Sequence, residues 1–64
     1  MRSTDELRET ILGAARSEFA QFGLAGARID RIARAASASK ERLYAHFRDK
    51  ETLFRSVVAA DSAE

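Results

Sequence analysis

Side chains able to bind a polyanion gather in the stretch 40–50 of this 64-residue chain. Lys40 is predicted in the first turn of a helix, where it can reach a phosphate or the O6/N7 edge of guanine. Arg42 is the best candidate for reading guanine, because its guanidinium fork matches two acceptors. The alternatives are a solvated lysine for Lys40 and, for Arg42, an i,i+4 surface pair or a backbone contact.

Two neighbours of these cations have weaker chemistry. Phosphates repel the carboxylate of Glu41, so we favour a role in orienting Lys40 or Arg42, or a solvated side chain, over accepting a hydrogen bond from cytosine N4. Ala45 offers only a methyl group, which at best touches the methyl group of a thymine.

The charge of the chain is unevenly distributed. Residues 1–27 carry three basic and four acidic side chains, residues 28–50 carry seven and three, and residues 51–64 carry one and three. A net charge of +1 therefore hides a local +4 in the middle third. Local fields rather than the total steer a polyanion, although a solvated basic face is the alternative interpretation.

Length and composition exclude several classes of protein. A domain of this size buries only about 60% of its unfolded surface, which leaves little material for the walls of an enzyme cleft. The chain has no cysteine and one histidine, so disulfides and thiolate zinc sites are excluded. No stretch approaches the ~20 apolar residues of a membrane span. We expect no enzyme activity, no cofactor, no metal and no membrane partner.

Apolar spacing predicts an all-α fold that positions these side chains. Residues repeat every three or four positions in four segments, which we place at roughly 4–22, 28–35, 40–46 and 50–60. The second and third are short helices joined by a turn of three to four residues, which is typical of a helix-turn-helix. The fold class is a small helical bundle: a three-helix unit plus the start of a fourth, connecting helix.

End signals support these boundaries. Ser3-x-x-Glu6 has the spacing of a capping box, and Gly23 stands where a left-handed C-terminal cap favours glycine. The segment 24–27 is predicted to be a connector. Ser39 is a good N-cap for the third helix and Asp49 for the fourth, whereas Arg28 cannot cap the second.

The order and spacing of these residues resemble the N-terminal domain of TetR-family transcriptional regulators. The resemblance runs from about Arg8 to Val58 and is most specific in its last part. The matching residues are Ile11-Leu12-x-Ala14-Ala15-x-x-x-Phe19-x-x-x-Gly23, Ile32-Ala33-x-x-Ala36-x-x-Ser39 and Leu43-Tyr44-x-His46-Phe47-x-x-Lys50-Glu51-x-Leu53.

The resemblance implies sequence-specific binding of double-stranded DNA by a regulator, in the first place a repressor. The third helix would enter the major groove of a pseudo-palindromic operator, and the fourth would lead to a C-terminal domain. In the family that domain binds a small-molecule inducer and forms the homodimer. It is absent from these 64 residues, since family members run to roughly 200. The implied location is the bacterial cytoplasm, at the nucleoid.

The resemblance also assigns roles to residues. Tyr44 would contact the DNA backbone, with a core role as the alternative, and His46 would donate to phosphate, with capping of the helix end as the alternative. Lys50 would clamp a phosphate across the groove from the second helix. Both Arg28 and Arg31 could approach the flanking backbone. The candidate DNA-binding residues are Arg28, Ser39, Lys40, Glu41, Arg42, Tyr44, Ala45, His46 and Lys50.

Three positions depart from the family pattern. Ser37-Ala38 stands where Gly-Val is usual, and a left-handed non-glycine residue costs about 1–2 kcal/mol. Arg28 replaces a Ser or Thr cap typically worth ~1 kcal/mol. Glu41-Arg42 replaces a pair such as Gly-Thr, which implies a change of operator specificity rather than a loss of function.

An interpretation from a different class is a helical protein–protein interaction module. The apolar stripes of the first and fourth helices would then recruit a partner helix. The fourth helix has no stop signal at its C-terminal end, which favours this alternative slightly.

Overall fold

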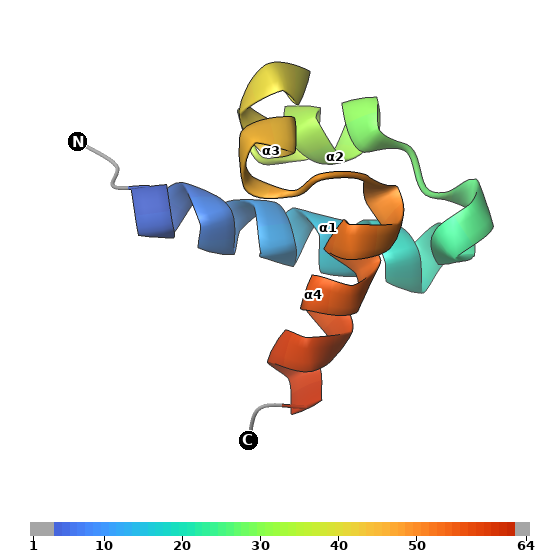
Figure 1. Ribbon diagram of the computed structural model, residues 1–64. Helices are drawn as coiled ribbons and strands as arrows, with labels where there is room; N and C mark the ends of the chain where they lie inside the picture. The colour runs from blue at the N-terminus through green and yellow to red at the C-terminus, as the bar shows by residue number, and fades with distance from the viewer. Residues whose placement is uncertain (1–3, 63–64) are drawn as a thin grey trace.

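The structure, a computed structural model, describes residues 4–62. Its helices are α1 (Thr4–Gly26), α2 (Ile29–Ala35), α3 (Lys40–His46) and α4 (Lys50–Ser62), and the described residues contain no strand (Figure 1). The predicted all-α class with a helix-turn-helix is confirmed. Ser3 of the predicted capping box lies outside the described residues.

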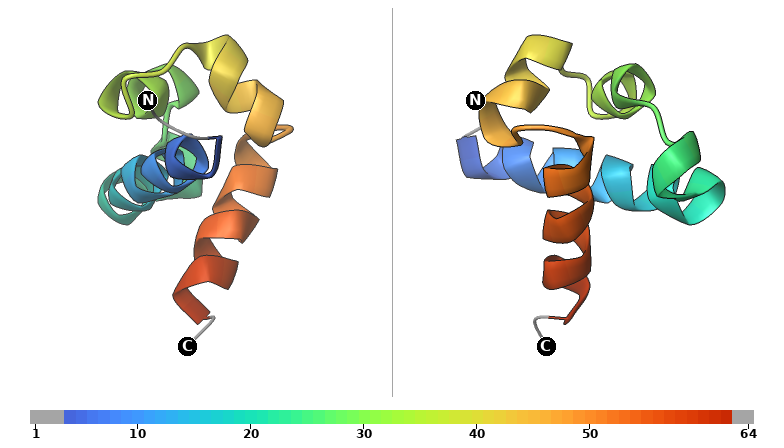
Figure 2. Two further views of the ribbon diagram at one scale, coloured as in Figure 1. Left: turned by 90° about the vertical axis from the view of Figure 1, so that its left-hand side faces the viewer. Right: turned by 45° about the vertical axis from the view of Figure 1, so that its right-hand side comes forward.

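The helix-turn-helix and the C-terminal end of α4 lie at different ends of the molecule. Helices α2 and α3 lie on one side of α1, and α4 crosses α1 and runs away from them (Figures 1 and 2). The C-terminal end of α4 therefore lies far from the helix-turn-helix. Across the described part of the chain, no helix is both long and apolar enough to cross a membrane.

A single core holds the four helices together. The largest side chains with no more than 2% exposure come from every helix or its cap: Ile11, Ile32, Leu43, Phe47 and Leu53. Edge-to-face packing of Phe19 on Phe54, with ring centroids 5.0 Å apart, joins α1 to α4. Because α2 and α3 have only seven residues each, this packing rather than their own propensity keeps them helical.

Helix α1 contains a break at Gly23, where φ is 75° and ψ is 173°. This combination is essentially restricted to glycine, so the residue type matters here. The chain then forms one more helical turn, closed by a 3.0 Å bond from the Ala27 N–H to the Gly23 carbonyl. The predicted connector over 24–27 is thus wrong for residues 24–26, because the chain resumes helical hydrogen bonding after the break.

The turn between α2 and α3 is a Schellman motif. Ser37 has a φ of 56°, and its N–H bonds to the Arg34 carbonyl over 3.0 Å. The Ala38 N–H bonds to the Ala33 carbonyl over 2.9 Å. These bonds satisfy the carbonyls at the end of α2 and hold a serine in a conformation that favours glycine.

Candidate nucleic-acid interface

Helix α3 presents most of its surface to solvent. Within it only Leu43 is buried, at 0% exposure, and the following Phe47 adds a second anchor in the core. Lys40, Glu41, Arg42 and Ala45 are all exposed. The core therefore fixes the helix from one side and leaves its charged residues available to a partner.

Ser39 sets where α3 begins. Its Oγ accepts a 3.1 Å hydrogen bond from the Arg42 N–H, as the sequence predicts for an N-cap. The same bond links the cap to the residue proposed to read a base. The position of Arg42 on the helix surface is therefore fixed by the first turn of α3.

The aromatic residues near the end of α3 differ in exposure. Tyr44 is 45% exposed, so its ring is not part of the buried core. His46 is half-buried, and its ring lies 6.3 Å from that of Phe47, centroid to centroid. The guanidinium of Arg8 also lies over the Phe47 ring, 5.3 Å from its centroid. Sequence reasoning missed this cation beside the end of α3.

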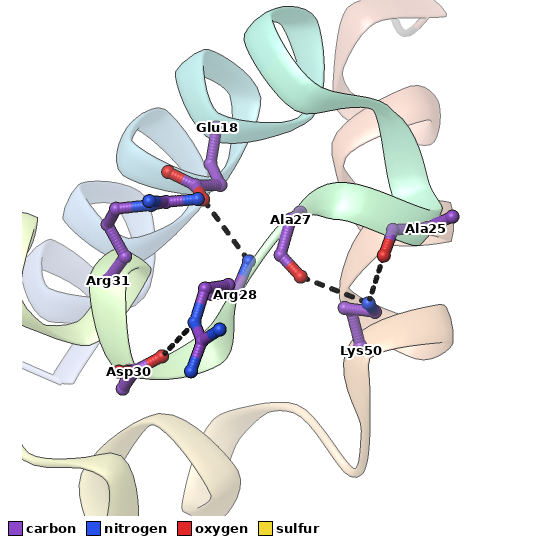
Figure 3. Close-up of polar contacts among 7 residues, drawn as sticks. All are labelled: Glu18, Ala25, Ala27, Arg28, Asp30, Arg31 and Lys50. Atoms are coloured by element: carbon purple, nitrogen blue, oxygen red, sulfur yellow. Dashed lines mark hydrogen bonds and ion pairs between the residues drawn. The ribbon is translucent and has the colours of Figure 1, made fainter.

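Lys50 faces the connection between α1 and α2. Its Nζ donates to the carbonyl oxygen of Ala27 over 3.0 Å and to that of Ala25 over 3.5 Å (Figure 3). The side chain is half-buried. The first residue of α4 thus joins two segments that are far apart in the sequence, a role that the sequence analysis did not assign to it.

Arg28 occupies the N-cap position of α2 in extended backbone, and its side chain makes no cap hydrogen bond. The guanidinium is exposed and its Nε donates to Asp30 Oδ1 over 3.3 Å. This hydrogen bond lowers the pKa of Asp30 below its ordinary value. Arg28 remains on the surface, at the start of the helix-turn-helix.

The Arg31 side chain contacts α1 although it is partly exposed. Its Nε donates to Glu18 Oε2 over 2.6 Å, and its guanidinium carbon lies 4.2 Å from the centroid of the Phe22 ring. Figure 3 shows Arg31 and Arg28 pointing in different directions from the start of α2. The structure thus places Arg31 in an ion pair with Glu18 of α1, whereas Arg28 pairs with Asp30 of α2.

Glu18 is a residue that sequence reasoning missed. This charged residue is buried, 7% exposed, and it also accepts the Arg28 main-chain N–H over 3.2 Å. Its spacing held a signal: Glu18 lies seven positions after Ile11 and three after Ala15, on the apolar stripe of α1. A carboxylate on such a stripe indicates a buried partner.

Asp49 holds the start of α4, as predicted. Its Oδ1 accepts the Thr52 N–H over 2.8 Å, and this backbone hydrogen bond lowers the pKa of the carboxyl group. The cap also fixes Lys50, the next residue in the chain.

Comparisons with known proteins agree on one family. The family model for bacterial regulatory proteins of the tetR family matches residues 11–57. The chain is 47% identical over 57 residues to the transcriptional repressor SCO4008 of Streptomyces coelicolor, covering 89% of this chain and 30% of the relative. It is 39% identical over 57 residues to the transcriptional regulator RutR of Escherichia coli K12, covering 89% and 27%.

A solved structure is similar as well. The crystal structure of SCO4942, an inferred transcriptional regulator of Streptomyces coelicolor, superposes with a TM-score of 0.86 at 52% identity. The match covers 88% of this chain and 31% of that one. The chain thus spans about 30% of the length of the relatives that it matches.

Proposed function

The chain belongs to the TetR family of bacterial regulatory proteins, and on this basis we propose that it binds a specific DNA operator through α3 as part of a repressor. In this proposal α3 lies in the major groove. The complete regulator is a cytoplasmic, nucleoid-associated homodimer, whose remaining domain binds a small-molecule inducer. Two copies then read the half-sites of a pseudo-palindrome one helical turn apart.

The exposure of α3 is the observation that carries this proposal. Among its seven residues only Leu43 is buried, so the charged residues of α3 have no packing role. A surface helix anchored by two apolar side chains presents its outer face without the rest of the domain obstructing it. The local +4 charge over residues 28–50 supplies attraction to phosphates.

Within this interface the side chains contact different parts of the DNA. Arg42 reads guanine through two hydrogen bonds, Lys40 contacts a phosphate or guanine, and Glu41 orients these two cations. Tyr44 and His46 donate to phosphates, and Ala45 approaches a thymine methyl group. Arg28 contacts the backbone that flanks the major groove.

Lys50 combines a structural and a binding role in this proposal. An ammonium group has three donors, and the carbonyls of Ala27 and Ala25 account for two of them. The third remains for a phosphate. The carbonyl contacts would hold the ammonium in place before DNA arrives.

A salt titration tests the proposal. Duplex DNA binding is followed by fluorescence anisotropy at several salt concentrations. If the chain neutralises about four phosphates, the slope of log K against log salt is near −3.6. Residues 1–64 bound as a single copy to one half-site should bind weakly, because avidity from a second half-site is then lacking. A flat salt response would contradict DNA binding.

Charge removal separates this function from the protein-interaction alternative. Lys40→Ala is the better substitution, because Lys50→Ala also removes the contacts to Ala27 and Ala25. For DNA binding, Lys40→Ala weakens affinity and makes the salt slope shallower by about 0.9. The opposite outcome, unchanged DNA binding together with a lost association with a partner helix, would favour the interaction module.

A further inference from the structure

Glu18 is a buried carboxylate with two partners at the start of α2. One of its oxygens, Oε2, accepts both the Arg28 main-chain N–H at 3.2 Å and the Arg31 Nε at 2.6 Å. The Glu18 side chain is 8% exposed, while that of Arg31 is 46% exposed. A buried charge persists only when it is paired and hydrogen-bonded, and this one is both.

The contact to Arg28 satisfies an N–H group at the start of α2. The first four N–H groups of a helix lack intrahelical partners, and the N-cap residue contributes one of them. Glu18, which belongs to α1, satisfies the main-chain N–H of the N-cap residue Arg28. In a capping box a glutamate within the same helix has this role.

The segment between α1 and α2 is therefore held from two sides. Glu18 accepts from the Arg28 N–H, and Lys50 donates to the carbonyl of the preceding Ala27 (Figure 3). The peptide group between Ala27 and Arg28 thus has both its N–H and its C=O bonded to side chains. These contacts fix the direction in which the chain leaves α1 and the point from which the Arg28 side chain extends.

We propose that Glu18 is a positioning residue for DNA binding, which sets the place of the Arg28 guanidinium at the DNA backbone. This inference rests on the proposed function. Glu18 itself does not touch DNA, and its charge alone works against DNA binding. It contributes by holding the Arg28 main chain, from which the exposed Arg28 side chain extends at the start of α2. Glu18 also pairs with Arg31.

Two substitutions separate positioning from charge. Glu18→Gln and Glu18→Met both remove the negative charge and keep a side chain of similar length, but only glutamine retains an acceptor for the Arg28 N–H. Glu9→Gln, at an exposed position of α1, is the matched control for charge. If charge alone mattered, all three variants would bind DNA more tightly and by a similar factor.

The experiment is a double-mutant cycle with Arg28→Ala, read by DNA anisotropy under conditions where circular dichroism shows every variant folded. Arg28→Ala keeps the main-chain N–H. Glu18→Met therefore has the same structural effect whether residue 28 is arginine or alanine. Any interaction of the released Arg31 with DNA is also the same in these two backgrounds. We expect Glu18→Met to weaken binding about tenfold relative to Glu18→Gln when Arg28 is present. Without the Arg28 side chain the two variants should agree within about twofold.

If Glu18→Met lost the same DNA affinity relative to Glu18→Gln with and without the Arg28 side chain, the proposal would be overturned, because Glu18 would then act on folding alone. Equal affinities of Glu18→Met and Glu18→Gln with Arg28 present would overturn it as well. Amide hydrogen exchange of the unmodified chain adds a test that needs no variant: the Arg28 N–H should be protected, and exchange at the rate of an open loop would refute the contact. Absence of DNA binding by the unmodified chain would instead refute the proposed function.

Discussion

The ammonium group of Lys50 lies 3.0 Å from the main-chain carbonyl oxygen of Ala27, 23 positions earlier in the chain. This contact ties the first residue of α4 to the entry of the helix-turn-helix. The start of α4 is thereby bonded to the chain segment that leads into α2.

Loss of this contact should lower stability. Lys50→Ala removes a charge-assisted bond to the carbonyl of the buried Ala27, and we expect the free energy of unfolding to fall by about 1 kcal/mol. Urea denaturation followed by circular dichroism measures the change. Arg55→Ala, at an exposed position of the same helix, is the control and should change stability little. Equal stabilities of the two variants would show that the Lys50 contacts contribute nothing.

Substitution by alanine should change the stability of the fold in opposite directions at Gly23 and at Gly13. An added Cβ meets no atom within 4 Å at either position, so only the backbone distinguishes them. Gly23 has a φ of 75°, and we expect Gly23→Ala to destabilise the fold by about 1–3 kcal/mol. Gly13 lies within α1, and Gly13→Ala should stabilise it by up to about 1 kcal/mol.

Thermal denaturation of both variants checks this difference in sign. A change of about 1 kcal/mol moves the melting temperature of a domain of this size by about 4–8 °C. Similar melting temperatures for the two variants would mean that the break in α1 does not depend on glycine.

Stability should fall in acid through Asp49. The hydrogen bond from the Thr52 N–H lowers the pKa of Asp49 below the ordinary value of 3.8. The unfolded chain therefore takes up this proton first as the pH decreases. The stabilisation from the carboxylate is complete above the unfolded pKa and is lost as the pH falls through the folded one. Asp30, with its pKa lowered by Arg28, acts in the same direction.

The urea midpoint, measured from neutral pH into acid, reports this dependence. Asp49→Asn keeps an acceptor for the Thr52 N–H but cannot ionise, so the decrease from about pH 5 into acid should become smaller. A decrease identical to that of the unmodified chain would exclude Asp49 as a contributor.

The sequence predicted those features that depend on local spacing. Apolar residues every three or four positions identify an all-α bundle, and Ser39 and Asp49 each accept the hydrogen bond expected of a cap. Contacts between distant positions were not predictable in this way. Glu18 and Arg31 are 13 positions apart, and nothing in the local pattern of either residue names the other as partner.

The turn at Ser37 illustrates a second limit. The resemblance to a known family shows where glycine is usual, and the structure gives Ser37 the positive φ that glycine adopts easily. Sequence spacing alone could not show that the backbone keeps this shape with serine. The hydrogen bonds of Ser37 and Ala38 to the end of α2 supply the reason, because they compensate for a strained conformation.

Arg42 and Lys40 should affect DNA recognition in different ways. Arg42 extends from the first turn of α3, fixed by the bond from its N–H to Ser39 Oγ. If it pairs with guanine through two hydrogen bonds, Arg42→Ala should reduce discrimination at one base pair by about 1–3 kcal/mol. Selection from a random pool of duplexes, repeated with each variant, measures the preference at every position. If Lys40 binds a phosphate, Lys40→Ala should weaken binding to all sequences alike and leave the selected motif unchanged. A motif that Arg42→Ala leaves intact would assign base reading to another residue of α3.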